Sequence, residues 1–269
     1  MARRFDRPGE EENEDQLARP RDQPEHDLSE ILKKVRAQTP ARLLAGRTGA
    51  AYRTSTHLDL RQAHAAARDA VRTELDLLSD LGEDFVRRWN LLEVCSQAAS
   101  KEQYLLRPDL GRHLIDGSRE ELTRCCTIEQ DLQLLIGDGL SVTAVVVQIP
   151  RLLPLLSEGA HARHWSVGSI LVIRHCRVGI LNQIGELLKP RVAVLLIGER
   201  PGLATCESLS AYMAYRPKAL DTDANRNLIS NIHARGVSTE SAAQRILDLA
   251  ALMMKTQQSG YRLREEKSS

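Results

Sequence analysis

The amino-acid sequence predicts an α/β protein whose mostly parallel sheet carries helices on both faces. Three short, continuous apolar runs carry this prediction, at residues 132–136, 167–173 and 192–197. Strands that are apolar on both faces are typical of parallel sheets, because helices cover both sides of such a sheet. Segments with helical composition or spacing separate the runs, as the crossovers between parallel strands require. We expect a helical N-terminal region and a disordered N-terminal tail to precede this sheet.

The first tenth of the chain has little to bury. Residues 1–26 are rich in Arg, Glu, Asp and Pro, and such a segment cannot offset the conformational entropy lost on folding. We therefore expect a disordered, charged tail. Residues 27–36 place apolar side chains on one helical face, which predicts a short helix that ends before Pro40. Residues 41–51 hold basic residues and glycines and predict a loop.

The next segment has a strongly helical composition. Residues 58–81 are rich in Ala, Leu, Arg and Glu, which favours one helix that ends near Gly82. Residues 107–112 are typical of a turn, and residues 118–126 predict a further helix. We therefore divide the chain into a tail, a helical N-terminal region and a sheet domain, with bounds 1–26, 27–100 and 101–269.

The remaining elements alternate as an α/β fold requires. Residues 140–156 predict a helix after the first strand, and residues 180–188 predict a shorter one after the second. Residues 208–215 predict a fourth strand. The last helix begins at Ser238 or Thr239, either of which could cap it. Its apolar face recurs at helical spacing, in Ile246, Leu249, Ala250 and Met253.

The composition argues against several classes of function. Lys and Arg total 37 against 36 for Asp and Glu, so no overall charge attracts nucleic acid or an anionic membrane. No apolar run approaches the roughly 18 residues that a membrane span needs, and the charged start is unlike a secretory signal. The 5 cysteines form no CxxC pair, which favours reduced thiols over disulfides or a zinc site. We expect a soluble, cytoplasmic protein that binds neither nucleic acid nor membrane.

Two glycine-rich loops follow predicted strands, at residues 137–141 and 198–202. Ligands of open α/β sheets bind outside the carboxyl ends of the strands, and glycine lets the backbone approach a ligand closely. Each loop also carries an acid, Asp138 or Glu199, that could accept a hydrogen bond from a hydroxyl or an amide. Glycines that only turn the chain are the alternative for either loop alone. The two together favour a nucleotide-like ligand, without dinucleotide or P-loop spacing.

Other candidate sites are weaker. His161 and His164 have helical spacing but lack a third ligand nearby, so we predict no metal site. No histidine stands close to Cys125 and Cys126 in the sequence, which favours buried thiols over reactive ones. Residues 208–210 hold two serines, but no G-x-S-x-G motif surrounds them, so they do not form the nucleophile elbow of a hydrolase. A ligand crevice without a catalytic set suggests a subunit that completes the active site of another chain.

Several motifs then stand in a fixed order along the chain. They are YLLRPDLGR (104–112), DGLS (138–141), NQIGE (182–186), GERPGL with ESLS (198–210) and ISNIH (229–233). Together they resemble the small (light) subunit of ethanolamine ammonia-lyase, over residues from about 38 to about 260.

This resemblance implies a Rossmann-like, cobalamin-binding domain over residues 101–269, packed against a TIM-barrel large subunit in a hexamer of heterodimers. It implies that adenosylcobalamin binds at the subunit interface and keeps its own dimethylbenzimidazole as the lower ligand of cobalt (base-on). The chain fits this expectation because it lacks Asp-x-His-x-x-Gly. The complex would be a carbon–nitrogen lyase of ethanolamine catabolism that releases acetaldehyde and ammonia by radical chemistry. The substrate-binding residues belong to the large subunit, so no catalytic residue is expected here.

The family's cobalamin contacts fall on Val178, Glu199 and Leu228. Without the resemblance, Val178 would be interpreted as a core valine. Packing explains Glu199 poorly, because its carboxylate stands between glycines at the end of a strand. Leu228 stands where the family has cysteine and would make a backbone or apolar contact. The family also implies a cytoplasmic complex inside a bacterial microcompartment, with the segment from Asp27 as a targeting helix or partner contact.

Two alternatives stay open beside the enzyme subunit. One is a carrier or regulator that binds another nucleotide or corrinoid, and the other is a structural subunit that only stabilises a barrel partner.

Overall fold

The structure is a computed structural model that describes residues 30–35, 37, 47–202 and 204–263. The chain separates into two compact units, residues 1–39 and 40–269. The first unit contributes helical residues at 30–35 and 37, which agrees with the short helix predicted over 27–36. The predicted disordered tail, residues 1–26, lies outside the described residues.

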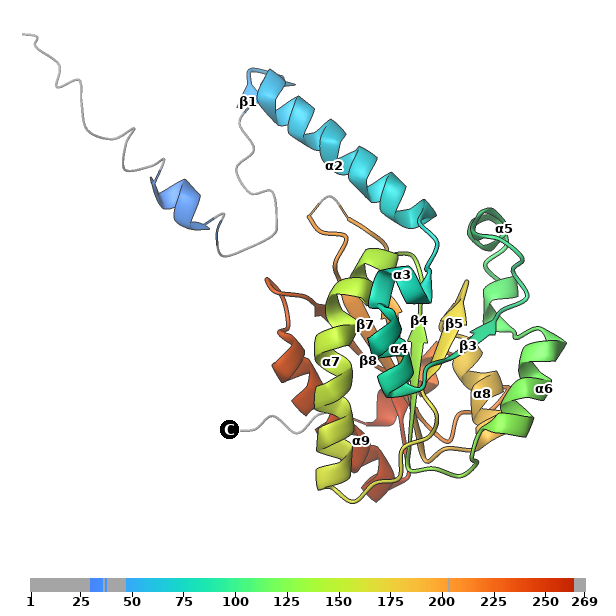
Figure 1. The fold of residues 1–269 in the computed structure, drawn as a ribbon. Coiled ribbons are helices and arrows are strands. Elements are labelled where there is room, and N and C mark those ends of the chain that lie inside the picture. The colour runs from blue at the N-terminus through green and yellow to red at the C-terminus, as the bar shows by residue number, and fades with distance from the viewer. Residues whose placement is uncertain (1–29, 36, 38–46, 203, 264–269) are drawn as a thin grey trace, which may run out of the picture. The chain divides into compact units, whose positions relative to one another are not determined.

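The second unit is built around a six-stranded sheet (Figure 1). Its spatial order is β3-β5-β4-β6-β7-β8. The first four strands in this order pair in parallel, and β6, β7 and β8 pair antiparallel. The strands are β3 (Leu92–Cys95), β4 (Leu132–Gly137), β5 (Leu171–Arg174), β6 (Val192–Gly198), β7 (Leu209–Tyr215) and β8 (Asn227–Ile232).

The predicted, mostly parallel sheet is confirmed in part: β3, β5, β4 and β6 pair in parallel, whereas the predicted strand β7 and the additional strand β8 are antiparallel. Parallel neighbours need a crossover, usually a helix, and no helix separates β6 from β7 in the described residues. The chain therefore turns back, and β7 pairs antiparallel with β6. The Rossmann-like expectation holds for the order β5-β4-β6, in which both connections are helical and the chain crosses from one side of β4 to the other.

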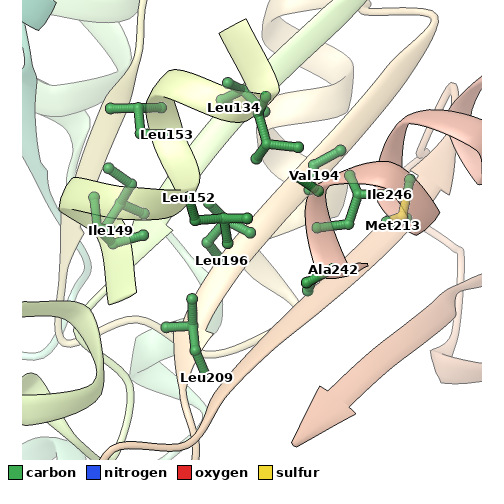
Figure 2. Packing of buried hydrophobic residues seen from close by; sticks show 14 of the residues in the cluster. Leu134, Ile149, Leu152, Leu153, Val194, Leu196, Leu209, Met213, Ala242 and Ile246 are labelled. Atoms are coloured by element: carbon green, nitrogen blue, oxygen red, sulfur yellow. The ribbon is translucent and has the colours of Figure 1, made fainter. Parts of the chain in front are cut away.

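Helices cover both faces of the sheet, as predicted. Helices α7 (Val142–Ala162) and α9 (Thr239–Thr256) lie on one face and contact each other, and α6 (Asp116–Cys125) and α8 (Ile180–Leu188) contact each other on the opposite face (Figure 1). Side chains alternate between these layers along β6, because successive residues of a strand point to opposite faces. Val194 and Leu196 belong to the α7–α9 core, which Figure 2 shows from close by. Leu195 belongs to the other core.

Helix α7 runs beyond its predicted end at residue 156, through Pro150 and Pro154. By length and composition alone it could cross a membrane, contrary to our expectation that no apolar segment is long enough. Its buried residues, which include Ile149, Leu152 and Leu153, pack instead into the core of this chain. The absence of a membrane partner stays a prediction.

The helix predicted over residues 58–81 is wrong in its extent. Helix α2 (Thr54–Arg72) ends early, and two short helices follow, α3 (Leu77–Leu81) and α4 (Glu83–Trp89). The carboxylate of Asp76 accepts hydrogen bonds from the backbone N–H groups of Leu78 and Ser79, each at 3.1 Å. Such an N-cap begins a new helix, and the helical composition of residues 58–81 does not reveal it.

Several further elements differ from the predictions. The strand predicted over residues 167–173 begins only at Leu171. Part of the loop predicted over 41–51 forms a small hairpin of β1 (Arg47–Thr48) and β2 (Ala51–Tyr52), while residues 41–46 lie outside the described residues. The structure adds α5 (Lys101–Leu106) and three 3-10 helices, η1 (Leu110–Arg112), η2 (Asp223–Asn225) and η3 (Gly260–Arg262). The segment 27–100 also contributes strand β3 to the sheet, and the division at residue 101 stays a prediction.

A buried ion pair connects α5 to the end of β4. The side chains of Lys101 and Asp138 are almost inaccessible, with Nζ 3.3 Å from Oδ2. Lys101 also donates to the carbonyl oxygen of Gly139 at 2.9 Å. The second carboxylate oxygen of Asp138 accepts the backbone N–H of Cys176 at 2.9 Å. One carboxylate therefore links three segments that are distant in the sequence.

We expect the substitution Lys101→Met to lower the free energy of unfolding by about 3–5 kcal/mol, because it leaves the Asp138 carboxylate buried without its counter-charge. Urea denaturation of the purified chain measures this loss. The matched control is Arg87→Met, which breaks the exposed i,i+4 pair with Glu83 and costs much less because solvent screens that pair. A loss in Lys101→Met as small as in the control would contradict the prediction.

Candidate functional site

The two predicted glycine loops meet at the carboxyl ends of β4 and β6. The backbone N–H of Leu140 donates to the carbonyl oxygen of Gly198 at 3.0 Å. A Cβ atom on Gly139 would collide with Gly198, and one on Gly198 would collide with the carbonyl oxygen of Ser141. Gly139 also has a φ of 54°, which favours glycine. These two glycines thus allow the loops to pack on each other, as the simpler of our two interpretations held.

The loops lie where the sheet changes direction. Successive crossovers leave β4 toward β5 on one side and reach β6 on the other. Open α/β sheets bind ligands at such a switch point, outside the carboxyl ends of the strands. The position of the loops, although not their glycines, therefore indicates a ligand site.

Asp138 does not face that site, contrary to our expectation that it could accept from a ligand. Its side chain is 1% exposed, and both oxygens are occupied by Lys101 and by the backbone of Cys176. The acid after β4 therefore holds the framework of the site together.

A pocket of about 360 Å³ lies beside the two loops and contains all three residues inferred from the family resemblance. Val178 comes from the loop between β5 and α8, Glu199 follows β6, and Leu228 lies on β8. Leu228 is 47% exposed and stands opposite Tyr212 of β7. The other lining residues are Tyr104, Gly139, Leu140, Arg177, Ile197, Gly198, Arg200, Ser210, Tyr212 and Ser230.

The carboxylate of Glu199 is held by three donors. The hydroxyl of Ser208 donates to Oε2 at 2.7 Å. The hydroxyl of Ser210 and the backbone N–H of Asn231 donate to Oε1, at 2.6 and 2.9 Å. These bonds join β7 and the end of β8 to the β6 loop, so local structure explains this carboxylate better than we expected. A carboxylate has about four acceptor positions, which leaves one on Oε2 for a further donor.

A larger pocket of about 730 Å³ adjoins the first and shares Arg177, Val178 and Tyr212 with it. The sequence alone does not indicate this pocket, because its residues come from separate segments, among them η1, α8, β7 and the turn that contains η2. Burial raises the pKa of the Tyr212 phenol, and the nearby Asp223 and Glu199 raise it further. Tyr212 therefore stays protonated and can act as a donor at the border between the pockets.

Tyr104 lies beneath this border and is fully buried. Its hydroxyl donates to the carbonyl oxygen of Cys176 at 2.9 Å, and burial raises its pKa well above the usual range. The guanidinium of Arg177 lies 4.3 Å from the centre of its ring. This stacking fixes Arg177, and with it the neighbouring Val178, at the wall of both pockets.

The weaker candidates do not assemble into sites. His161 lies in α7, but His164 follows the end of the helix with a φ of 57°, and the part of the chain that is described holds no group of three side chains suited to a metal. Cys126 is half-buried, which raises the pKa of its thiol, whereas Cys125 is exposed, contrary to our expectation of buried thiols. Cys125 is the last residue of α6, where the helix meets solvent.

The chain has clear relatives. A sequence model of the family described as "Ethanolamine ammonia-lyase light chain (EutC)" matches residues 29–264. The ethanolamine ammonia-lyase small subunit of Clostridium perfringens is 39% identical over 235 residues, which cover 87% of this chain and 78% of that protein. The small subunit of Clostridium acetobutylicum is 37% identical, over 87% of this chain and 95% of that protein. That of Fusobacterium nucleatum is 40% identical, over 87% and 78%.

The family match spans most of the chain and includes every element that builds the two pockets. The resemblance inferred from the five sequence motifs is therefore confirmed, and the chain belongs to the family of ethanolamine ammonia-lyase light chains, the small subunits of that enzyme.

Proposed function

We propose that this small subunit binds adenosylcobalamin in the pocket formed by Val178, Glu199 and Leu228, and that the large subunit closes the same site from the other side. The observation that carries the proposal is the convergence of these three residues, which come from three separate segments, in one pocket at the switch point of the sheet. Family membership supports it, because the relatives are small subunits of ethanolamine ammonia-lyase.

The chemistry of the pocket fits a corrinoid. A corrin ring has broad apolar faces and a rim of amide groups that donate and accept hydrogen bonds. Val178 and Leu228 supply apolar contact surface, while the free acceptor position of Glu199 suits an amide N–H. The pocket is much smaller than the cofactor and is open on one side, so a second protein surface is needed to enclose the ligand.

The cofactor supplies the radical chemistry when it is bound, and the protein supplies binding and orientation. No histidine lines the smaller pocket among the described residues, so this chain offers no imidazole to cobalt there. The base-on form, in which dimethylbenzimidazole would stay the lower ligand, belongs to this proposal. Leu228 and Val178 exclude water from one side of the ring, and Glu199 orients its rim.

The complex then converts ethanolamine to acetaldehyde and ammonia as a carbon–nitrogen lyase of ethanolamine catabolism. Ethanolamine binds on the large subunit, this chain contributes no catalytic residue, and the subunits assemble as a hexamer of heterodimers. We place the complex in the cytoplasm, inside a bacterial microcompartment. Acetaldehyde release from this chain, its large-subunit partner and the two mixed tests the activity, and only the mixture should be active.

The substitution Leu228→Ala should weaken adenosylcobalamin binding to the assembled complex about tenfold, because it removes roughly 1–2 kcal/mol of apolar burial. The side chain is 47% exposed, so its removal should leave the stability of the chain almost unchanged. Equilibrium dialysis gives the dissociation constant, and size-exclusion chromatography checks assembly. The control is Leu78→Ala, which removes an exposed leucine outside both pockets. Unchanged affinity in an intact Leu228→Ala complex would contradict the proposal.

The substitution Glu199→Ala should weaken adenosylcobalamin binding at least tenfold while the subunits still assemble. It also leaves three donors without an acceptor, so a lower melting temperature is expected. The variant Ser208→Ala separates the two effects, because it removes one bond to the carboxylate and keeps the carboxylate itself. Ser208→Ala should retain most of the affinity. Equal losses of affinity in both variants would assign Glu199 a structural role only.

A further inference from the structure

Three arginine side chains line the larger pocket. Arg112 lies in η1, Arg177 in the loop before α8, and Arg226 in the turn between η2 and β8. The pocket adjoins the proposed cofactor site and shares Arg177 with it. Three guanidinium groups from three segments thus converge beside one ligand site.

Arg226 is deeply buried for a charged residue. Its side chain is 5% exposed, pairs with the carboxylate of Asp223 and donates to Oδ1 of Asn182 at 2.7 Å. Its Nε is buried and has no hydrogen-bond partner in the described part of the chain. Burial lowers the pKa of Arg226, the charges of Asp223 and Asp221 oppose this shift, and the charge of Arg112 adds to it. Arg112 is therefore close enough for the two cations to repel each other.

Within the described residues, Arg112 and Arg177 are not held in ion pairs, although the charge of Arg112 contributes to lowering the pKa of the nearby Asp109. The Nε of Arg177 is buried without a hydrogen-bond partner, and the ring face of Tyr104 offsets only part of its charge. The stem of Arg112 packs against Gly179, where an added Cβ would lie 2.9 Å from its Cγ. Both guanidinium groups are thus positioned by contacts that do not neutralise them.

The carboxylates of the same pocket are engaged elsewhere. Glu186 accepts the backbone N–H of Ala219 at 3.2 Å, and Asp221 accepts that of Lys218 at 2.8 Å. Asp223 pairs with Arg226. These acids fix the turn between β7 and β8 and keep their negative charge, but in the described part of the chain none of them forms an ion pair with Arg112 or Arg177.

We propose that Arg112, Arg177 and Arg226 form a subsite for a phosphate group, namely the phosphodiester in the nucleotide tail of the bound corrinoid. The inference rests on the proposed function, because it places the tail in the larger pocket while the ring occupies the smaller one. Guanidinium groups suit this ligand because their N–H pairs match two phosphate oxygens at once. The tail is covalently linked to the ring, and the two pockets share one wall.

The test compares two cofactor forms on the assembled complex. Adenosylcobalamin carries the phosphate, ribose and base, and adenosylcobinamide lacks all three. The substitutions Arg177→Gln and Arg112→Gln should each weaken adenosylcobalamin binding about tenfold and change adenosylcobinamide binding less than twofold. The side chain of Arg112 is exposed, so the Arg112→Gln variant should fold normally. The control is Arg119→Gln, outside both pockets on α6, which should alter neither affinity.

Inorganic phosphate distinguishes the source of the anion. It should compete with adenosylcobalamin in the unsubstituted complex and not with adenosylcobinamide. Phosphate that binds at these arginines without competing with adenosylcobalamin would overturn the assignment to the tail. Equal losses for both cofactor forms, or no loss for either, would overturn the subsite and leave the proposed function intact. A Leu228→Ala variant without effect would instead oppose the proposed function.

Discussion

The carboxylate of Asp138 joins three segments, and most of the pocket wall is attached to one of them. Lys101 begins the helix that carries Tyr104. The Asp138 carboxylate also accepts the backbone N–H of Cys176, which precedes Arg177 and Val178. The loop that contains Asp138 packs against Gly198, next to Glu199. A buried ion pair adds little net stability, because desolvation offsets the attraction between its charges. The ion pair instead fixes the relative positions of α5, the loop after β4 and the loop after β5.

The second acid shows how a similar residue serves a different purpose at the neighbouring strand end. Glu199 is half-buried, and its three donors all come from the antiparallel part of the sheet, through Ser208, Ser210 and Asn231. The departure from a fully parallel sheet is therefore what builds the wall around it. A helix after β6 would have carried the chain away from this edge, and β8 would not bring Leu228 beside the loop.

Periodicity predicted the elements whose burial is uniform and missed those that depend on single contacts. The apolar runs of β4 and β6 are completely buried and were recognised at once. Strand β8 was not predicted, because it is an edge strand with mixed burial and two asparagines. The break before α3 depends on one carboxylate, Asp76, which has no signal in a window of helical composition.

The candidate site could be located by sequence but not assembled by it. Strand-end loops indicated the edge, yet their glycines and Asp138 serve internal packing. Val178 resembles a core valine in any pattern analysis, and only the family motifs marked it. Arg177 and Arg226 gave no signal at all, because an isolated arginine in a turn is typical of a solvated surface.

An open pocket that a second subunit completes has a thermodynamic consequence under the proposed function. A ligand that touches both subunits binds the assembled pair more tightly than either chain alone, so by linkage it must also tighten their association. Leu228 illustrates the balance. Its 47% exposure costs the free subunit little, since only part of one apolar side chain faces water. The remaining burial becomes available only when the cofactor and the large subunit cover it, which places that part of the binding energy in the assembly.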